Sequence, residues 1–262
     1  REFLKALLEK GKQVFIITNN ASKTTTEYVA KISELGFNML EEKNIISPNV
    51  VLVDYMKKNP KFGEKGVYLI GNPGVAAMLK DAGIQSFGQG RLLLPEGQMY
   101  PKKAEVDLSK PVSSVVVGFD PNISYLKIVT AANYLKDKNV GFFITNEDYT
   151  FPGQEEDFII PGTGVISASV RAAVAPREPI VCGKPSATLS NYLRENFHLN
   201  PEKTIMFGDR LDTDIKFGNS NGFDTVWMPT GVHTMQDVAR AVNNAELEQI
   251  PTYTYSFEKH VE

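Results

Sequence analysis

The amino-acid sequence predicts an α/β protein with a mainly parallel sheet, in which an inserted α/β domain interrupts a discontinuous outer core. Short all-apolar runs alternate with helical segments along almost the whole chain, as is typical of parallel sheets covered on both faces. Two linkers, at residues 60–66 and 175–179, divide this alternation into three series. We therefore expect a core made of residues 1–65 and 177–262, with residues 66–176 inserted between its halves.

The first series begins with a helix whose apolar residues share one face and which is expected to end at Gly11. The apolar run 14–17 follows as a strand. A helix is expected over residues 24–35, because Gly36 is a normal helix-stop residue, and another over residues 49–57.

The second and third series repeat this pattern. Expected strands cover residues 67–70, 115–117, 140–145, 180–182, 204–207, 224–228 and 253–255. Expected helices cover residues 75–80, 125–135, 165–174, 187–196, 213–220 and 235–241. Residues 151–164 are rich in glycine, proline and acidic side chains, which favours a long loop.

Composition places the chain among ordinary globular proteins, since 42% of its 262 residues are hydrophobic and 23% are charged. The formal net charge of −3 provides no basic field for nucleic acid. The apolar runs are far shorter than the roughly 18 residues of a membrane helix. Cys182 is the single cysteine, so no internal disulfide can form. We expect a cytoplasmic protein whose partners include neither nucleic acid nor a membrane.

The first polar loop, Thr18-Asn19-Asn20, directly follows the strand expected at residues 14–17. A hydroxyl group and exposed backbone amides at a strand end are suited to binding an anion. The alternative is a capping turn, because Asn20 and Ser22 are good helix caps.

The second polar loop contains Lys184 and follows the strand expected at residues 180–182. A lysine held beside Pro185 at a strand end is a natural counter-charge for a phosphate. The alternative is a solvated lysine in a surface turn.

The third polar loop, residues 208–214, holds three carboxylates in six positions after a strand. Carboxylate oxygens suit Mg²⁺, which takes one or two protein carboxylates and completes its shell with water and substrate. Helix capping is the alternative, and it suits Asp212 because a helix is expected to follow. Asp209 comes directly off the strand, so we interpret it as the metal ligand.

The three loops occur in order, each at the end of an apolar strand. In open α/β sheets the carboxyl ends of the strands bind ligands. A hydroxyl anion site, a lysine and a carboxylate cluster together suit phosphoryl transfer, which requires phosphate binding, charge neutralisation and Mg²⁺.

With these motifs in order, the chain resembles the haloacid dehalogenase (HAD) superfamily, and within it the cap-bearing phosphatases related to phosphoglycolate phosphatase, pyridoxal phosphatase and 4-nitrophenylphosphatase. The matching segments are residues 15–23 (FIITNNASK), 115–120 (VVVGFD), 161–164 (PGTG), 183–186 (GKPS), 208–215 (GDRLDTDI) and 230–232 (TGV). This resemblance implies a Rossmann-like, HAD-like core with residues 66–176 as an α/β cap over the active site.

The resemblance also implies a role for each polar loop. Thr18 binds the transferred phosphoryl group, and Asn19 and Asn20 complete its loop. Lys184 neutralises the phosphate, and Asp209 binds Mg²⁺. Asp214 is the second acid of the same motif and orients the lysine or the metal-bound waters.

One motif of the family has no match. The nucleophile of the family is the first aspartate of an Asp-x-Asp-Gly motif on a strand preceding the opening helix, and the second aspartate of that motif is the general acid. No such motif occurs here, and the chain begins at Arg1. We expect both aspartates to lie upstream of this sequence. We also expect the chain as written to be inactive, because covalent catalysis needs its nucleophile.

Substrate choice is expected to involve the stretch 145–152, which matches a substrate-selecting loop of the family. Pyridoxal phosphatases have a histidine where Phe151 stands, and phosphoglycolate phosphatases have an apolar residue. Phe151 therefore favours 2-phosphoglycolate as the substrate, unless it only packs within the cap. The resemblance also implies a homodimer formed through the cap.

Two other classes of function remain open at this point. The first is a catalytically dead, phosphate-binding pseudoenzyme, which the missing nucleophile motif would explain. The second is a nucleotide-binding α/β domain, but Gly162-Thr163-Gly164 lacks the full glycine fingerprint after a strand. Within the phosphatases, a pyridoxal phosphatase is the alternative to a phosphoglycolate phosphatase.

Overall fold

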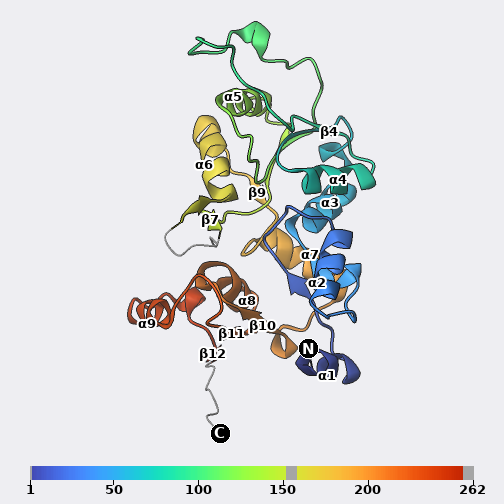
Figure 1. The fold of residues 1–262 in the computed structure, drawn as a ribbon, viewed down its shortest axis with the longest axis vertical. Coiled ribbons are helices and arrows are strands. Elements are labelled where there is room, and N and C mark those ends of the chain that lie inside the picture. The colour runs from blue at the N-terminus through green and yellow to red at the C-terminus, as the bar shows by residue number, and fades with distance from the viewer. Residues whose placement is uncertain (1, 152–157, 256–262) are drawn as a thin grey trace. The chain divides into compact units, whose positions relative to one another are not determined.

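The computed structural model describes residues 2–151 and 158–255, which divide into two compact units (Figure 1). The first unit contains residues 2–151 and 160–183, and the second contains residues 158–159 and 184–255. Each unit is an α/β structure, as the alternation of apolar runs predicts. None of the described helices has the length and apolar character needed to cross a membrane.

The first unit opens with helix α1 (Glu2–Glu9) and a small parallel sheet of β1 (Ile16–Ile17) and β2 (Ile45–Ile46). Helix α2 (Thr25–Glu34) lies between these strands in sequence, and helix α3 (Pro48–Lys58) follows β2. A capping box between Thr24 and Glu27 begins α2, because each side chain bonds the backbone amide of the other residue. The short helices η1 (Glu42–Asn44) and η2 (Pro60–Phe62) are connections.

A five-stranded, fully parallel sheet forms the rest of the first unit, in the order β4–β3–β5–β6–β9. Its strands are β3 (Val67–Ile70), β4 (Ser86–Phe87), β5 (Ser114–Val117), β6 (Gly141–Ile144) and β9 (Ile180–Val181). Its helices are α4 (Pro73–Asp81), α5 (Tyr125–Tyr134), α6 (Thr163–Val174) and the short η3 (Lys103–Glu105).

Helices cover both faces of this sheet, with α5 and α6 on one side and α3 and α4 on the other (Figure 1). Every residue of the three central strands is consequently buried. Burial on both faces is the reason that these strands are continuous apolar runs in the sequence instead of alternating ones.

The parallel sheet continues past the boundary expected at residue 177. Strand β9 pairs with β6, and the amide of Cys182 donates to the carbonyl of Ile144 at 3.0 Å. We had expected residues 180–182 to form a strand of the core halves, but their backbone hydrogen bonds go to the sheet of the middle segment. The division of the chain into core and cap stays a prediction.

Both ends of the long loop expected at residues 151–164 have regular secondary structure. Strands β7 (Thr150–Phe151) and β8 (Ile160–Pro161) form an antiparallel pair, and α6 begins at Thr163 with Gly162 as its N-cap. Residues 152–157 of that expected loop lie outside the described residues.

The second unit is a three-stranded parallel sheet in the order β10–β11–β12 with helices around it. Its strands are β10 (Ile205–Gly208), β11 (Asp224–Trp227) and β12 (Tyr253–Thr254). Its helices are α7 (Ala187–Phe197), α8 (Lys216–Ser220), α9 (Met235–Asn243) and the short η4 (Pro201–Lys203) and η6 (Leu247–Gln249).

One turn of π-helix, η5 (Leu211–Ile215), joins β10 to α8 where the sequence predicts the start of an ordinary helix. Leu211 and Ile215 of this turn belong to the core of the second unit, together with Trp227 and α9 residues Val238 and Ala241. The apolar residues of the turn are therefore buried in this core. Its acidic residues, Asp212 and Asp214, lie a few residues after the end of β10.

Candidate functional site

Lys184 and Asp214 form a buried ion pair in the second unit. The ammonium Nζ of Lys184 lies 2.5 Å from Oδ1 of Asp214, and the two side chains are 8% and 7% exposed. A charge-assisted hydrogen bond in such a dry environment holds the lysine in one orientation. The expected counter-charge is therefore a buried, oriented lysine, and the alternative of a solvated surface lysine is wrong.

The backbone of the third polar loop wraps around the carboxylate of Asp214. Oδ2 of Asp214 accepts from the amides of Asp209 at 3.2 Å and Arg210 at 3.1 Å. Gly208 lies so close to Asp214 that any side chain at position 208 would collide with it. These contacts place Asp214 against Gly208, the last residue of β10.

Asp209 is half-buried beside this ion pair. Burial raises the pKa of its carboxyl group above the usual value, the neighbouring Asp214 raises it further, and Lys184 partly offsets the rise. Its backbone carbonyl accepts from Nε1 of Trp227 at 3.1 Å, and its carboxylate packs against Gly231. Asp209 is therefore fixed at both its backbone and its side chain.

Asp212 has a different environment from the other two acids. Its carboxylate accepts from Nε and Nη2 of Arg210, at 3.1 and 2.8 Å. Burial raises the pKa of Asp212, but the hydrogen bonds and charge of Arg210 outweigh this effect, so the net pKa is lowered. Asp212 is thus paired with arginine inside the π-turn, where we had considered a helix-capping role.

The acidic loop fits Mg²⁺ through a single protein ligand. Among residues 2–151 and 158–255, no three His, Cys, Asp or Glu side chains are grouped so as to hold a metal ion. Asp214 already accepts from Lys184 and two amides, so its position suits holding the lysine. Asp209 is the half-buried carboxylate in contact with that pair, and one or two carboxylates are what Mg²⁺ usually takes from a protein.

The Thr18 loop lies in the first unit, directly after β1. The amide of Thr18 donates to Ile46 of β2 at 3.0 Å, and the Thr18 hydroxyl accepts from the amide of Asn20 at 3.1 Å. Oδ1 of Asn20 accepts from the amide of Ser22 at 2.8 Å. These bonds form a turn within the loop and leave Asn20 exposed. Neither Asn20 nor Ser22 caps the following helix, because the N-cap of α2 is Thr24. The anion-binding role of Thr18 stays a prediction.

The loop after β6 contacts the Thr18 loop within the same unit. Nδ2 of Asn19 donates to Oδ1 of Asp148 at 3.0 Å, and Nδ2 of Asn146 donates to the carbonyl of Asn19 at 2.7 Å. Further along this loop, the ring of Phe151 packs edge-to-face against Phe119, with centroids 5.0 Å apart. Phe151 therefore does pack within this unit, in addition to lying in the stretch expected to select substrate.

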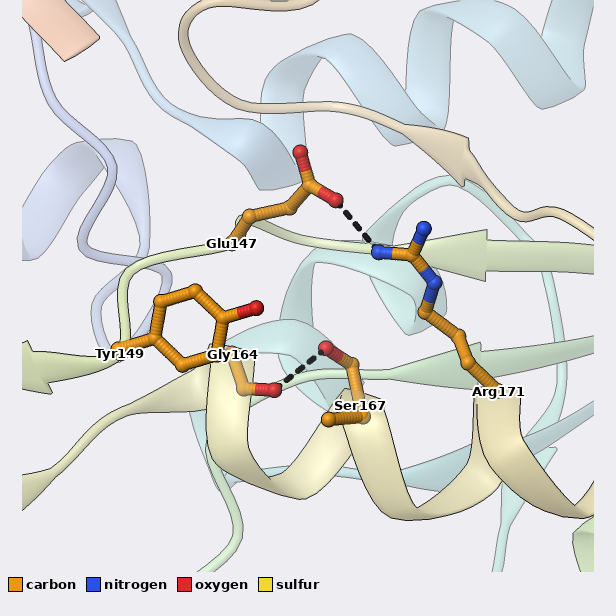
Figure 2. Close-up of a pocket in the computed structure, with 6 residues that line it drawn as sticks. Glu147, Tyr149, Gly164, Ser167 and Arg171 are labelled. Carbon is orange, nitrogen blue, oxygen red and sulfur yellow. Dashed lines mark hydrogen bonds and ion pairs between the residues drawn. The ribbon is translucent and has the colours of Figure 1, made fainter. Parts of the chain in front are cut away.

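A cavity of about 250 Å³ opens beside the same loop (Figure 2). Glu147 and Arg171 form an ion pair at 2.7 Å along it, and the hydroxyl of Ser167 donates to the carbonyl of Gly164 on α6. Arg171 also pairs with Glu178 at 2.5 Å. Two carboxylates therefore flank this arginine.

Sequence reasoning missed several residues that hold the site. Asn146 and Asp148 were noted as part of a matching stretch, but their contacts with Asn19 were not expected. Two residues that support the acidic loop were also missed. Trp227 donates to the carbonyl of Asp209, and Nδ1 of His233 accepts from the amide of Leu211 at 2.8 Å. The signal for Asn146 was present, since it lies two residues after the end of β6, a strand of a parallel sheet.

The chain belongs to the haloacid dehalogenase-like hydrolases, and within them to the phosphatases that carry a cap. The model of the haloacid dehalogenase-like hydrolase family matches residues 1–85, and a second, HAD-hydrolase-like model matches residues 181–253. The resemblance stated from the motifs is thereby confirmed.

Three curated relatives show where the chain falls within the family. It is 36% identical to glycerol-3-phosphate phosphatase of Gallus gallus over 88% of this chain and 73% of that protein. It is 34% identical to phosphoglycolate phosphatase 2 of Arabidopsis thaliana over 93% of this chain and 80% of that protein. It is 45% identical to a NipSnap protein of Caenorhabditis elegans over 84% of this chain, but it spans only 42% of that protein.

Solved structures agree with this assignment. The 4-nitrophenylphosphatase of Thermotoga maritima is similar with a TM-score of 0.75 and 25% identity, over 97% of this chain and 85% of that one. The p-nitrophenyl phosphatase of Archaeoglobus fulgidus has the same fold, with a TM-score of 0.78 and 24% identity over 97% and 87% of the two chains. A glycerol phosphate phosphatase of Mycobacterium tuberculosis, solved in complex with magnesium, also shares the fold, at 23% identity and a TM-score of 0.72 over 93% and 65% of the two chains.

Proposed function

We propose that this chain binds phosphate and selects the substrate in a Mg²⁺-dependent phosphatase of small phosphate monoesters, with 2-phosphoglycolate as the first candidate substrate. The observation that carries this proposal is the buried ion pair of Lys184 and Asp214 beside the half-buried Asp209. Burying a lysine charge costs free energy of desolvation, and pairing with a carboxylate offsets part of that cost. The pairing also holds the lysine in one orientation beside Asp209.

Each group in the proposed site has a chemical task. Lys184, held by Asp214, neutralises the charge on the phosphoryl oxygens. We propose that the hydroxyl of Thr18, in the first unit, also binds a phosphoryl oxygen. Asp209 would hold the Mg²⁺ ion, and that ion, when bound, supplies further charge neutralisation at the phosphoryl group.

The covalent step needs a nucleophile that residues 1–262 do not match. We propose that an aspartate in sequence preceding residue 1 attacks phosphorus and releases the alcohol, and that water then hydrolyses the aspartyl-phosphate. The relatives extend beyond the matched region, since the chain spans 73% of the Gallus gallus protein and 42% of the Caenorhabditis elegans protein. A pseudoenzyme remains the rival.

The experiment is a phosphate-release assay on the chain extended to include its natural upstream sequence. We expect hydrolysis that requires Mg²⁺, stops with chelator, and is nearly abolished by Asp209→Asn. The control is Asp224→Asn, which alters an exposed acid at the start of β11. Normal hydrolysis by Asp209→Asn, or no hydrolysis with Mg²⁺ present, would contradict the proposal, and the second result would favour the pseudoenzyme.

Substrate preference is tested in the same assay with three esters. Phe151, in place of a histidine, supports 2-phosphoglycolate over pyridoxal 5′-phosphate. Glycerol 3-phosphate is a second candidate, because the relative at 36% identity is named for that substrate. A highest kcat/KM for pyridoxal 5′-phosphate would contradict the assignment drawn from Phe151. The proposed homodimer is tested separately by light scattering of the same preparation.

A further inference from the structure

Two segments that are distant from Asn19 in sequence, around residues 145–148 and 183, meet it in the first unit. Asn146 donates to the Asn19 carbonyl at 2.7 Å, and Asn19 donates to the Asp148 carboxylate at 3.0 Å. The amide of Asp148 in turn donates to Oδ1 of Asn146 at 3.1 Å, which closes the arrangement. A side chain at Gly183 would collide with Asn19 and with the backbone of Thr145. Asn19 and Asn146 are 8% and 1% exposed. The bond between them is buried, and the two bonds of Asp148 are partly buried.

Side chains of α2 and α3 donate hydrogen bonds to other carbonyl groups of residues 19–23. Nδ2 of Asn49, a fully buried side chain on α3, donates to the carbonyls of Ala21 at 2.9 Å and Lys23 at 3.3 Å. The hydroxyl of Tyr28 on α2 donates to the carbonyl of Asn20 at 2.7 Å. Four carbonyl groups of residues 19–23 are thus engaged by side chains of the unit, so the loop is held in one conformation.

The contacts of Asn146 and Asp148 differ from those of Asn49 and Tyr28 because they come from the loop that leads to Phe151. Residues 145–148 follow β6, and β7, which contains Phe151, begins two residues later. The phosphate side and the proposed substrate side of the site are therefore joined by the Asn19–Asp148 bond. A carboxylate acceptor makes this a charge-assisted hydrogen bond, stronger than one between neutral groups.

We propose that Asp148 and Asn146 are positioning residues, which hold the phosphate-binding loop Thr18–Asn20 through Asn19 and couple it to the substrate-selecting loop. This inference rests on the proposed function of that loop. Neither side chain needs to touch substrate for this role. Loss of the Asp148 carboxylate leaves a buried amide of Asn19 without this acceptor and weakens phosphate binding.

The test compares Asp148→Ala with Asp148→Asn in the full-length protein. The alanine variant removes the acceptor, whereas Oδ1 of asparagine can still accept from Asn19. The two readouts are KM for 2-phosphoglycolate and the inhibition constant of inorganic phosphate, which has no organic part to contact the Phe151 loop. Asp137→Ala is the matched control, because Asp137 is an exposed acid that accepts within its own turn of the same unit.

For Asp148→Ala we expect KM and the inhibition constant of phosphate to rise together by about tenfold, with Asp148→Asn close to wild type. If KM rises while the inhibition constant of phosphate is unchanged, Asp148 acts on the substrate side alone and the inference is wrong. Equal loss of thermal stability in both variants, without recovery by asparagine, also overturns it.

Hydrogen exchange separates this inference from the proposed function. Amides of residues 18–21 are expected to exchange faster in Asp148→Ala than in the wild type or in Asp148→Asn. Unchanged exchange contradicts the positioning role, whatever the enzyme assay gives. A wild-type protein that neither releases phosphate nor binds inorganic phosphate contradicts the proposed function instead.

Discussion

The ammonium group of Lys184 lies 2.5 Å from the carboxylate of Asp214, and more than nine-tenths of each side chain is buried. The pair links two loops that are 30 residues apart in sequence. In such a pair each charge compensates the desolvation of the other, so removal of one partner leaves an uncompensated buried charge.

We therefore expect Asp214→Asn to lower the free energy of unfolding by about 3 kcal/mol. Urea denaturation measures this change. The control is Glu248→Gln, which removes the partner of Lys216 in an exposed pair at 2.9 Å and should change stability by less than about 1 kcal/mol. If both variants lose a similar free energy of unfolding, burial of the Lys184–Asp214 pair is not the cause of the loss.

Gly208 is expected to tolerate no side chain. In Gly208→Ala the added methyl group collides with Asp214, so the π-turn or the ion pair must shift, at a cost of about 1–3 kcal/mol. The same urea titration gives the value. In Gly63→Ala the nearest atoms belong to the flexible side chain of Ile84 at 3.3 Å, and this control should stay within about 1 kcal/mol of wild type. A Gly208→Ala protein of unchanged stability would contradict the close approach.

A second buried ion pair, between Lys127 and Asp120 at 2.5 Å, stabilises the first unit at the end of β5. Both side chains are almost fully buried, at 0% and 1% exposure. Lys127→Met should destabilise the protein by about 3–5 kcal/mol, because the Asp120 charge loses its partner. The double variant with Asp120→Asn should recover most of that loss, since asparagine keeps an acceptor for the Asn122 amide. If the double variant recovers no stability, the unpaired charge of Asp120 is not the cause of the loss.

Cys182 is expected to be unreactive in the folded protein. Complete burial raises the pKa of its thiol to about 12, so at pH 8 only about one thiol in ten thousand is ionised. A thiol in the unfolded chain ionises near pH 8.5, so its contribution to stability is complete below that pH and decreases as pH rises toward 12. Ellman's reagent should react only after denaturant is added, and rapid reaction of the native protein at pH 8 would contradict this burial.

Much of the local structure could be predicted from residues 14–17, 67–70 and 115–117. The uninterrupted apolar character of residues 67–70 and 115–117 reflects strands of a parallel sheet that is covered on both faces. Of residues 14–17, only Ile16–Ile17 form a strand, and both of its residues are half-buried. The π-turn at Leu211–Ile215 could not be predicted, because the apolar spacing of Leu211 and Ile215 also suits an ordinary helix. The sequence also did not determine which strand pairs with Ile180–Val181, because an apolar strand can pair with a strand of the core or of the inserted segment. In the structure it pairs with β6.

For the candidate site, residue types and their place after strands were sufficient to select Thr18, Lys184 and Asp209, because chemistry at strand ends is a local property of the chain. The partners of these residues depend on contacts between distant segments. Asp214 meets Lys184 across 30 residues, and Asp148 meets Asn19 across 129. Only folding brings such groups within hydrogen-bond distance and removes water from between them, so tertiary structure decided which polar residues act together.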